Sequence, residues 1–181
     1  MKITIARQCG SGGHEVAEAL AEKLNLEIFD KKRFVEEAKK RNVYDENANF
    51  LNEKPIDSFL YSIAMSYGAT NPRDRYIDFV KELTEQENCI IIGRCADYVL
   101  KDDPNVLRLF FFAPKEDCIV RVMEHDGITG RDAENKIEKI DKHRADYYKY
   151  YTGKDWYDAR NYDFCLNTTS MSYEKLVEVV K

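Results

Sequence analysis

The chain has 181 residues, 44% of them hydrophobic and 34% charged, with a formal net charge of −5 at pH 7. This length and composition fit one globular domain with a full hydrophobic core. The negative charge gives no support for a nucleic-acid or anionic-membrane partner, so an anionic substrate must be bound by local clusters of Arg and Lys. No apolar run approaches the ~20 residues that span a bilayer, and we expect no signal peptide before the first strand. Five scattered cysteines without a CxxC pair favour a cytoplasmic protein without a zinc site or disulfide framework.

Residues 2–24 read as a strand, a glycine-rich turn and a helix. Ile3–Ala6 is a short apolar run rich in β-branched residues, and apolar residues recur at helical spacing over Val16–Leu24. Between them lies Gly10–Gly13, which contains three glycines. This arrangement presents backbone N–H groups and the positive end of a helix to an anion. We therefore predict a phosphate-binding loop, with an ordinary tight turn as the alternative interpretation of the glycine spacing.

The glycine loop departs from the Walker A pattern G-x-x-x-x-G-K-[ST]. The Walker lysine reaches the β- and γ-phosphates, and the hydroxyl that follows it helps to hold Mg²⁺. Here Gly13 stands at the lysine position, and His14 or Glu15 stands at the hydroxyl position. We predict that Arg7, in the same segment, supplies the missing positive charge.

Short apolar strands alternate with helices along the rest of the chain. The strand at 89–92 is the most apolar and is predicted to be central, whereas residues 42–58 are predicted to form a loop. The alternation predicts one α/β domain over residues 1–181, with a five-stranded parallel sheet in three layers and helices on both faces. Helices inserted at about 34–86 are predicted to form a substrate-covering lobe. The other predicted strands are 26–29, 106–113 and 162–166, and the predicted helices are 34–40, 56–67, 73–86, 115–124, 131–151 and 173–180.

Polar residues at the ends of predicted strands are candidate ligands. Asp30 and Arg33 follow the second strand, although Asp30 also suits the N-cap of a helix with a solvated basic face. Arg94 follows Gly93 after the strand at 89–92, where a guanidinium can bind phosphate bidentately; a solvated loop residue is the alternative. The long predicted helix adds positive charge, which ordinary surface pairs four residues apart would also explain. Its candidate cations are Arg131, Lys142 and Arg144.

Four blocks of the sequence resemble the cytidylate kinase-like family, a divergent branch of the P-loop nucleoside-monophosphate kinases. They are ITIARQCGSGGHEVAEALAEKL, IIIGRCADYVL, KIDKHRADYYKYYTGKDW and NYDFCLNTTSMSYEKL. The similarity covers nearly the whole chain and keeps the order and spacing of the blocks. An S-G-G in place of the loop lysine is itself typical of this branch. The resemblance implies a P-loop NTPase fold with a nucleoside-monophosphate lobe and a lid-like segment at about 121–160.

The resemblance also implies roles for several candidate residues. Arg94 would bind the acceptor phosphate, and Arg7, chosen for its place in the loop, would act in catalysis in place of the lysine. Lid arginines of the family clamp the transferring phosphoryl group, and Arg121 and Arg131 fall at their positions. The remaining candidates are Gly10, Ser11, Gly12, Gly13, His14 and Glu15 for the donor nucleotide, and Asp30, Arg33, Lys142 and Arg144 for the substrate.

ATP and Mg²⁺ are the cofactors that the resemblance implies, and nucleotides are the implied partners. No Walker B aspartate follows the strand at 89–92, where Gly93 and Arg94 stand instead. We therefore expect no metal ligand from the protein, and Mg²⁺ held mainly through nucleotide phosphates and water. The sequence carries no signal of oligomeric state.

The leading hypothesis is a kinase, a transferase that moves the γ-phosphoryl group of ATP to a nucleoside monophosphate, with cytidylate first. A second hypothesis keeps the transfer and changes the acceptor to another small metabolite. A third is a nucleotide-binding regulator that lost transfer chemistry together with the loop lysine. Arg94 and the lid arginines favour an enzyme, because a regulator has less need of positive charge around a reaction centre.

Overall fold

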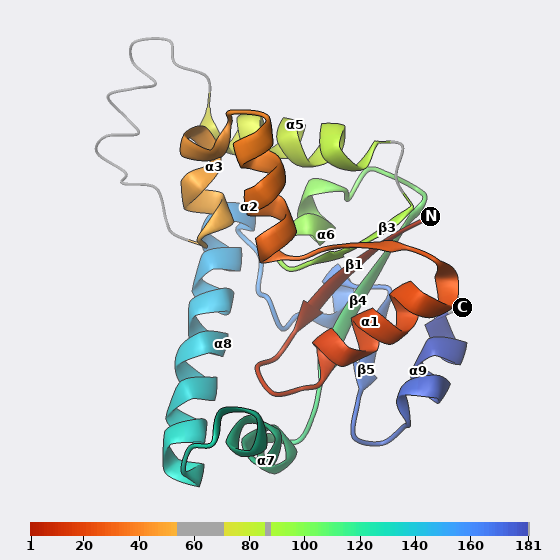
Figure 1. Cartoon of the computed structure of the whole chain (residues 1–181), viewed down its shortest axis with the longest axis vertical. Coiled ribbons are helices and arrows are strands. Elements are labelled where there is room, and N and C mark those ends of the chain that lie inside the picture. Colours follow the sequence, from red (N-terminus) through yellow and green to blue (C-terminus); the bar gives the residue numbers. More distant parts are fainter. Residues whose placement is uncertain (54–70, 86–87, 181) are drawn as a thin grey trace.

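The computed structural model describes residues 1–53, 71–85 and 88–180. Its sheet has five strands in the order β2-β3-β1-β4-β5, and each neighbouring pair is parallel. Figure 1 shows helices on both sides of this sheet, which confirms the predicted three-layer α/β architecture. The strands are β1 (Lys2–Arg7), β2 (Glu27–Phe29), β3 (Cys89–Ile92), β4 (Val106–Phe112) and β5 (Phe164–Asn167).

Most helices begin and end near the predicted residues because local capping signals fix them. The Asp30 side chain accepts a hydrogen bond from the Arg33 amide at 2.9 Å, so the predicted N-cap is confirmed. No described helix is both long and apolar enough to cross a membrane. These helices are α1 (Gly13–Leu24), α2 (Lys31–Lys40), α3 (Tyr44–Leu51), α5 (Pro72–Thr84), α6 (Ala96–Val99), α7 (Lys115–Asp126), α8 (Gly130–Thr152) and α9 (Tyr173–Val180), with a 3₁₀ turn at Ala159–Asn161.

Side chains of the inner strands alternate between two hydrophobic cores. One face of the sheet packs against α1 and α9, and the other face packs against α2, α3, α5, α6 and α8. Burial on both faces explains why the strands read as continuous apolar runs. A third, smaller core joins α7 to α8 (Figure 1) and contains Ala113, Cys118, Val122, Ala133 and Ile137.

Two local predictions were wrong. Residues Tyr44–Leu51 form α3, although 42–58 was predicted as a loop; Phe50 stacks on Tyr76 with ring centroids 4.4 Å apart, and this packing outweighs the weak helix propensity of the segment. The middle strand of the sheet is β1, and β3 lies beside it, between β1 and β2. An apolar strand is one that is buried on both faces of the sheet. Because β1 and β3 are both buried in this way, apolar character could not tell which of them is the middle strand. The helix predicted at 56–67 lies outside the described residues.

Candidate active site

The glycine loop connects the carboxyl end of β1 to the start of α1. Gly10 and Gly12 have φ of 73° and 75°, which residues with a Cβ rarely adopt. The hydroxyl of Ser11 donates to the Gln8 carbonyl at 2.8 Å and so closes the turn. Because Gly12 is an N-cap without a side chain, the first amides of α1 face outward with no intrahelical acceptor. This geometry fits a bound anion.

Gly13, at the position of a Walker lysine, is pressed against Arg7. A Cβ atom on Gly13 would lie 2.7 Å from the Cβ of Arg7 and 3.2 Å from the Cβ of Phe111. A Cβ on Gly93, at the end of β3, would lie 3.0 Å from Nη1 of Arg7. Two glycines therefore make room for one arginine side chain, which runs from β1 past the start of α1 to the end of β3.

Three guanidinium groups, of Arg7, Arg94 and Arg144, gather between the glycine loop and the end of β3. Burial, followed by repulsion from Arg144 and Arg94, lowers the pKa of Arg7 to about 9. Burial is also the main cause that lowers the pKa values of Arg94 and Arg144. The Arg7 guanidinium makes no hydrogen bond or ion pair with any residue in the described ranges. Positive charge is thus held close together where an anionic ligand would relieve the repulsion.

The turn after β3 is strained. Gly93, Arg94 and Cys95 have consecutive φ values of 74°, 62° and 54°. A non-glycine residue in this left-handed region costs of order 1–3 kcal/mol and needs its surroundings to hold it. The Tyr76 hydroxyl donates to the Arg94 carbonyl at 3.2 Å, and the Arg94 side chain forms an ion pair with Glu53.

Helix α8 is hydrogen-bonded to the glycine loop and to the end of β1. Asp141 accepts a hydrogen bond from the Cys9 amide at 2.8 Å, and Arg144 donates to the Arg7 carbonyl at 3.0 Å. Burial raises the pKa of Asp141 to about 6, against the lowering effects of the Cys9 amide, Arg144 and Arg7. We did not predict Asp141 from the sequence. Its signal was its spacing, because it lies four residues after Ile137 on an otherwise apolar face of the helix.

A pocket of about 310 Å³ opens between the glycine loop and helices α7 and α8. Arg121 spans one side of it, since its guanidinium donates to the Gly10 carbonyl at 3.3 Å and to the Thr169 hydroxyl at 3.2 Å. The pocket therefore combines backbone donors with several cations. Its charged and loop residues include Arg7, Gly10, Gly12, Gly13, His14, Glu15, Arg121, Asp126, Lys136 and Arg144.

The sequence and the fold are similar to those of known proteins. The sequence profile of the cytidylate kinase-like family matches residues 2–170. The chain belongs to the cytidylate kinase-like family. It is 30% identical to a cytidylate kinase of Archaeoglobus fulgidus, in an alignment that covers 99% of this chain and 92% of that protein. A cytidylate kinase of Methanopyrus kandleri is 28% identical over 99% of this chain and 90% of its own length.

Solved structures agree with this family assignment. An uncharacterized protein from Eubacterium ventriosum is 29% identical, with a TM-score of 0.76 over 99% of this chain and 95% of the other. Shikimate kinase from Bacteroides thetaiotaomicron has a TM-score of 0.55 at 16% identity, over 99% of this chain and 98% of its own, and shares the fold. Family and fold together support a phosphotransferase with the P-loop NTPase kinase fold.

Some predicted residues of this kinase-like chain lie away from the pocket. Arg33 pairs with Glu27 at 3.5 Å and with Glu37 at 3.6 Å on the outer side of α2. Arg131 is exposed at the start of α8. Lys142 lines a different hollow because two residues along a helix turn the side chain by about 200° from Arg144. Their roles, and that of the capping residue Asp30, stay predictions.

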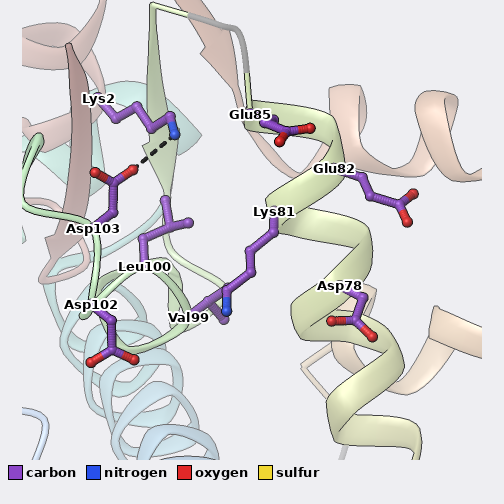
Figure 2. Close-up of a pocket in the computed structure, with 9 residues that line it drawn as sticks. All are labelled: Lys2, Asp78, Lys81, Glu82, Glu85, Val99, Leu100, Asp102 and Asp103. Atoms are coloured by element: carbon purple, nitrogen blue, oxygen red, sulfur yellow. Dashed lines mark hydrogen bonds and ion pairs between the residues drawn. The ribbon is translucent and has the colours of Figure 1, made fainter.

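A separate hollow of about 470 Å³ lies at the opposite edge of the sheet, where β1 begins (Figure 2). There Lys2 pairs with Asp103 at 2.9 Å. Carboxylates dominate the lining and repel phosphate, and ligands of open α/β sheets bind at the carboxyl ends of the strands. Figure 2 shows the other charged side chains of the hollow, Asp78, Lys81, Glu82, Glu85 and Asp102. The pocket at the glycine loop is therefore the better candidate.

Proposed function

We propose that this protein transfers the γ-phosphoryl group of ATP to a nucleoside monophosphate, and that cytidylate is the preferred acceptor. The observation that carries this proposal is the cluster of Arg7, Arg94 and Arg144 beside the glycine loop, in which the Arg7 guanidinium makes no hydrogen bond or ion pair with the described residues. Phosphoryl transfer needs alignment and neutralisation of charge more than covalent chemistry from the protein. Two curated relatives named cytidylate kinase support the choice of acceptor.

The donor phosphates fit the pocket between the glycine loop and α7. The outward amides at the start of α1 would bind phosphate oxygens, with the Arg121 guanidinium beside the loop at the Gly10 carbonyl. Mg²⁺, when bound with ATP, would neutralise phosphate charge and bridge phosphate oxygens. The Ser11 hydroxyl already donates to Gln8, so we propose that the protein holds the ion through nucleotide and water rather than through a loop hydroxyl.

We place the acceptor phosphate at the other side of the cluster, at Arg94. This guanidinium lies at the end of β3, and Arg7 and Arg144 lie between it and the glycine loop. Arg7 and Arg144 would thus face the phosphoryl group as it is transferred. Each well-placed donor there would lower the activation barrier of the transfer by roughly 2–4 kcal/mol. Arg7 would do in this site what the lysine does in a Walker loop.

The proposal is tested by ADP formation with ATP and Mg²⁺ against a panel of nucleoside monophosphates. We expect turnover with CMP to exceed turnover with AMP, GMP and UMP. Arg94→Lys should raise the acceptor KM far more than the KM for ATP, because a lysine cannot bind phosphate bidentately. Arg41→Ala is the matched control, since Arg41 is exposed and 4.0 Å from Glu82. Absence of both turnover and ATP binding would refute a kinase, and equal effects on both KM values would remove Arg94 from the acceptor site.

A further inference from the structure

The Glu53 carboxylate lies inside the arginine cluster. It forms an ion pair with Nη1 of Arg94, and its Oε1 is 3.8 Å from the position of a Cβ on Gly93, which Nη1 of Arg7 approaches to 3.0 Å. Glu53 also borders a small pocket of about 20 Å³ together with Arg7, Arg94 and Arg144. The Glu53 carboxylate therefore lies where the acceptor phosphate is proposed to bind.

We propose that Glu53 competes with the acceptor phosphate for Arg94, and that the acceptor must displace it to bind. This inference rests on the proposed function, because it assigns Arg94 to the acceptor. A guanidinium binds carboxylate and phosphate with the same pair of parallel N–H donors. The two anions therefore compete for the same donors of Arg94, and their like charges repel. The phosphate group carries more negative charge than the carboxylate and therefore replaces it at Arg94.

The backbone of Glu53 is left-handed, as is common just after the C-cap of a helix. Its φ is 53°, in the left-handed region, and its amide bonds to the Phe50 carbonyl at 3.1 Å. A glutamate keeps such a conformation only where contacts hold it. The ion pair with Arg94 is one of those contacts, and Arg94 is itself left-handed at 62°.

Displacement of Glu53 would also select the class of acceptor. Glu53 lies two residues after the end of α3 and itself lines the small pocket beside Arg94, so its release changes the lining of that pocket. A neutral metabolite offers no charge to replace the carboxylate and would leave the pair with Arg94 intact. A phosphomonoester supplies that charge. Among acceptors, only a phosphomonoester can therefore take Arg94 from Glu53, whereas an unphosphorylated acceptor such as a nucleoside leaves the pair in place.

The test compares Glu53→Gln and Glu53→Asp with wild type, by titration with CMP and separately with inorganic phosphate. Binding is measured by calorimetry and by fluorescence of Trp156, the single tryptophan, which borders the same small pocket. Glu53→Gln should bind both probes about tenfold more tightly, the factor expected if Glu53 holds Arg94 about 90% of the time. The matched control is Glu46→Gln in α3, where Glu46 is 3.4 Å from Arg75; it should bind like wild type.

Glu53→Asp separates direct competition from a long-range effect of charge. Aspartate keeps the charge and tolerates the left-handed conformation, but its shorter side chain does not reach Arg94 in the same way. Direct competition predicts tighter binding in this variant too. Wild-type affinity in Glu53→Asp, or weaker or unchanged binding in Glu53→Gln, would overturn the inference. Failure of all proteins to bind phosphate would also overturn it, whereas tighter phosphate binding without CMP binding or turnover would refute only the proposed function.

Discussion

Replacement of Gly13 by alanine tests whether the start of α1 must touch Arg7. A Cβ on Gly13 would lie 2.7 Å from the Cβ of Arg7 and 3.2 Å from the Cβ of Phe111. Both neighbours are the first side-chain atoms of residues in β1 and β4, so they move only if the sheet moves. Favourable contacts between carbon atoms begin at about 3.5 Å. The added methyl group must therefore push α1 away from the sheet.

The expected cost follows from two opposing effects. Extra volume in a well-packed site destabilises by roughly 1–3 kcal/mol. Gly13 has no positive φ and lies in α1, where alanine is favoured over glycine by about 0.5–1 kcal/mol. The net result is a loss of about 1–2 kcal/mol in the free energy of unfolding. Gly130→Ala is the matched control, because Gly130 also begins a helix and its Cβ would meet only the Met123 sulfur, at 3.4 Å.

Urea denaturation of both variants and of wild type measures the difference. Gly13→Ala should lose stability, and Gly130→Ala should be neutral or slightly stabilised by the better helix propensity. Gly13→Lys, which restores a Walker lysine, should be at least as destabilised as Gly13→Ala and should not bind ATP more tightly, because it displaces Arg7. If Gly13→Ala is as stable as wild type, the close contact between Arg7 and Gly13 is absent in solution, and the reasoning that Gly13 makes room for Arg7 fails.

Two further predictions concern charges of the same site. Arg7→Ala should weaken ATP binding by roughly 10–100-fold, equivalent to about 1.5–3 kcal/mol for one charged hydrogen bond, without loss of stability, because it removes a repelled cation; unchanged affinity in calorimetry would exclude Arg7 from the donor site. Burial raises the pKa of Asp141 to about 6, so folding favours its protonated form, and this contribution to stability is lost as pH rises from about 4 through 6. Asp141→Asn, which keeps an oxygen for the Cys9 amide, should therefore be more stable than wild type at pH 8 by up to about 3 kcal/mol and equal to it below about pH 4; equal denaturation midpoints at pH 8 would show that Arg144 and Arg7 offset the cost of burial.

Continuous apolar runs were enough to predict the fold. The segments at 3–6 and 89–92 are buried on both faces of the sheet, so the same pattern that marks them as strands also indicates helices on each side. Helix α3 escaped prediction because its Asn and Asp residues resemble a loop. What holds it is Phe50, stacked on Tyr76 and close to Tyr151, and these partners lie far along the chain. Local propensity carries no record of such contacts.

The cations of the candidate site were easier to predict than its anions. Arg7 is the last residue of β1 and Arg94 lies two residues after the end of β3, and the carboxyl ends of parallel strands converge at one edge of a sheet. Glu53 and Asp141 reach the same place from the loop after α3 and from the middle of α8. A counter-ion supplied by a distant helix has no local pattern, and among the 33 acidic residues of the chain neither stands out by composition.

The loss of the loop lysine changes how the site is assembled. In a Walker loop the cation belongs to the first turn of the helix and moves with it. Here the positive charge comes from β1, β3 and α8, and α8 is bonded to the loop twice, through Asp141 to the Cys9 amide and through Arg144 to the Arg7 carbonyl. Any shift of α8 therefore changes both the charge beside the loop and the conformation of the loop itself. If the proposed transfer occurs, donor binding and the position of α8 are coupled, and Arg144 acts on the donor site partly through the backbone of Arg7.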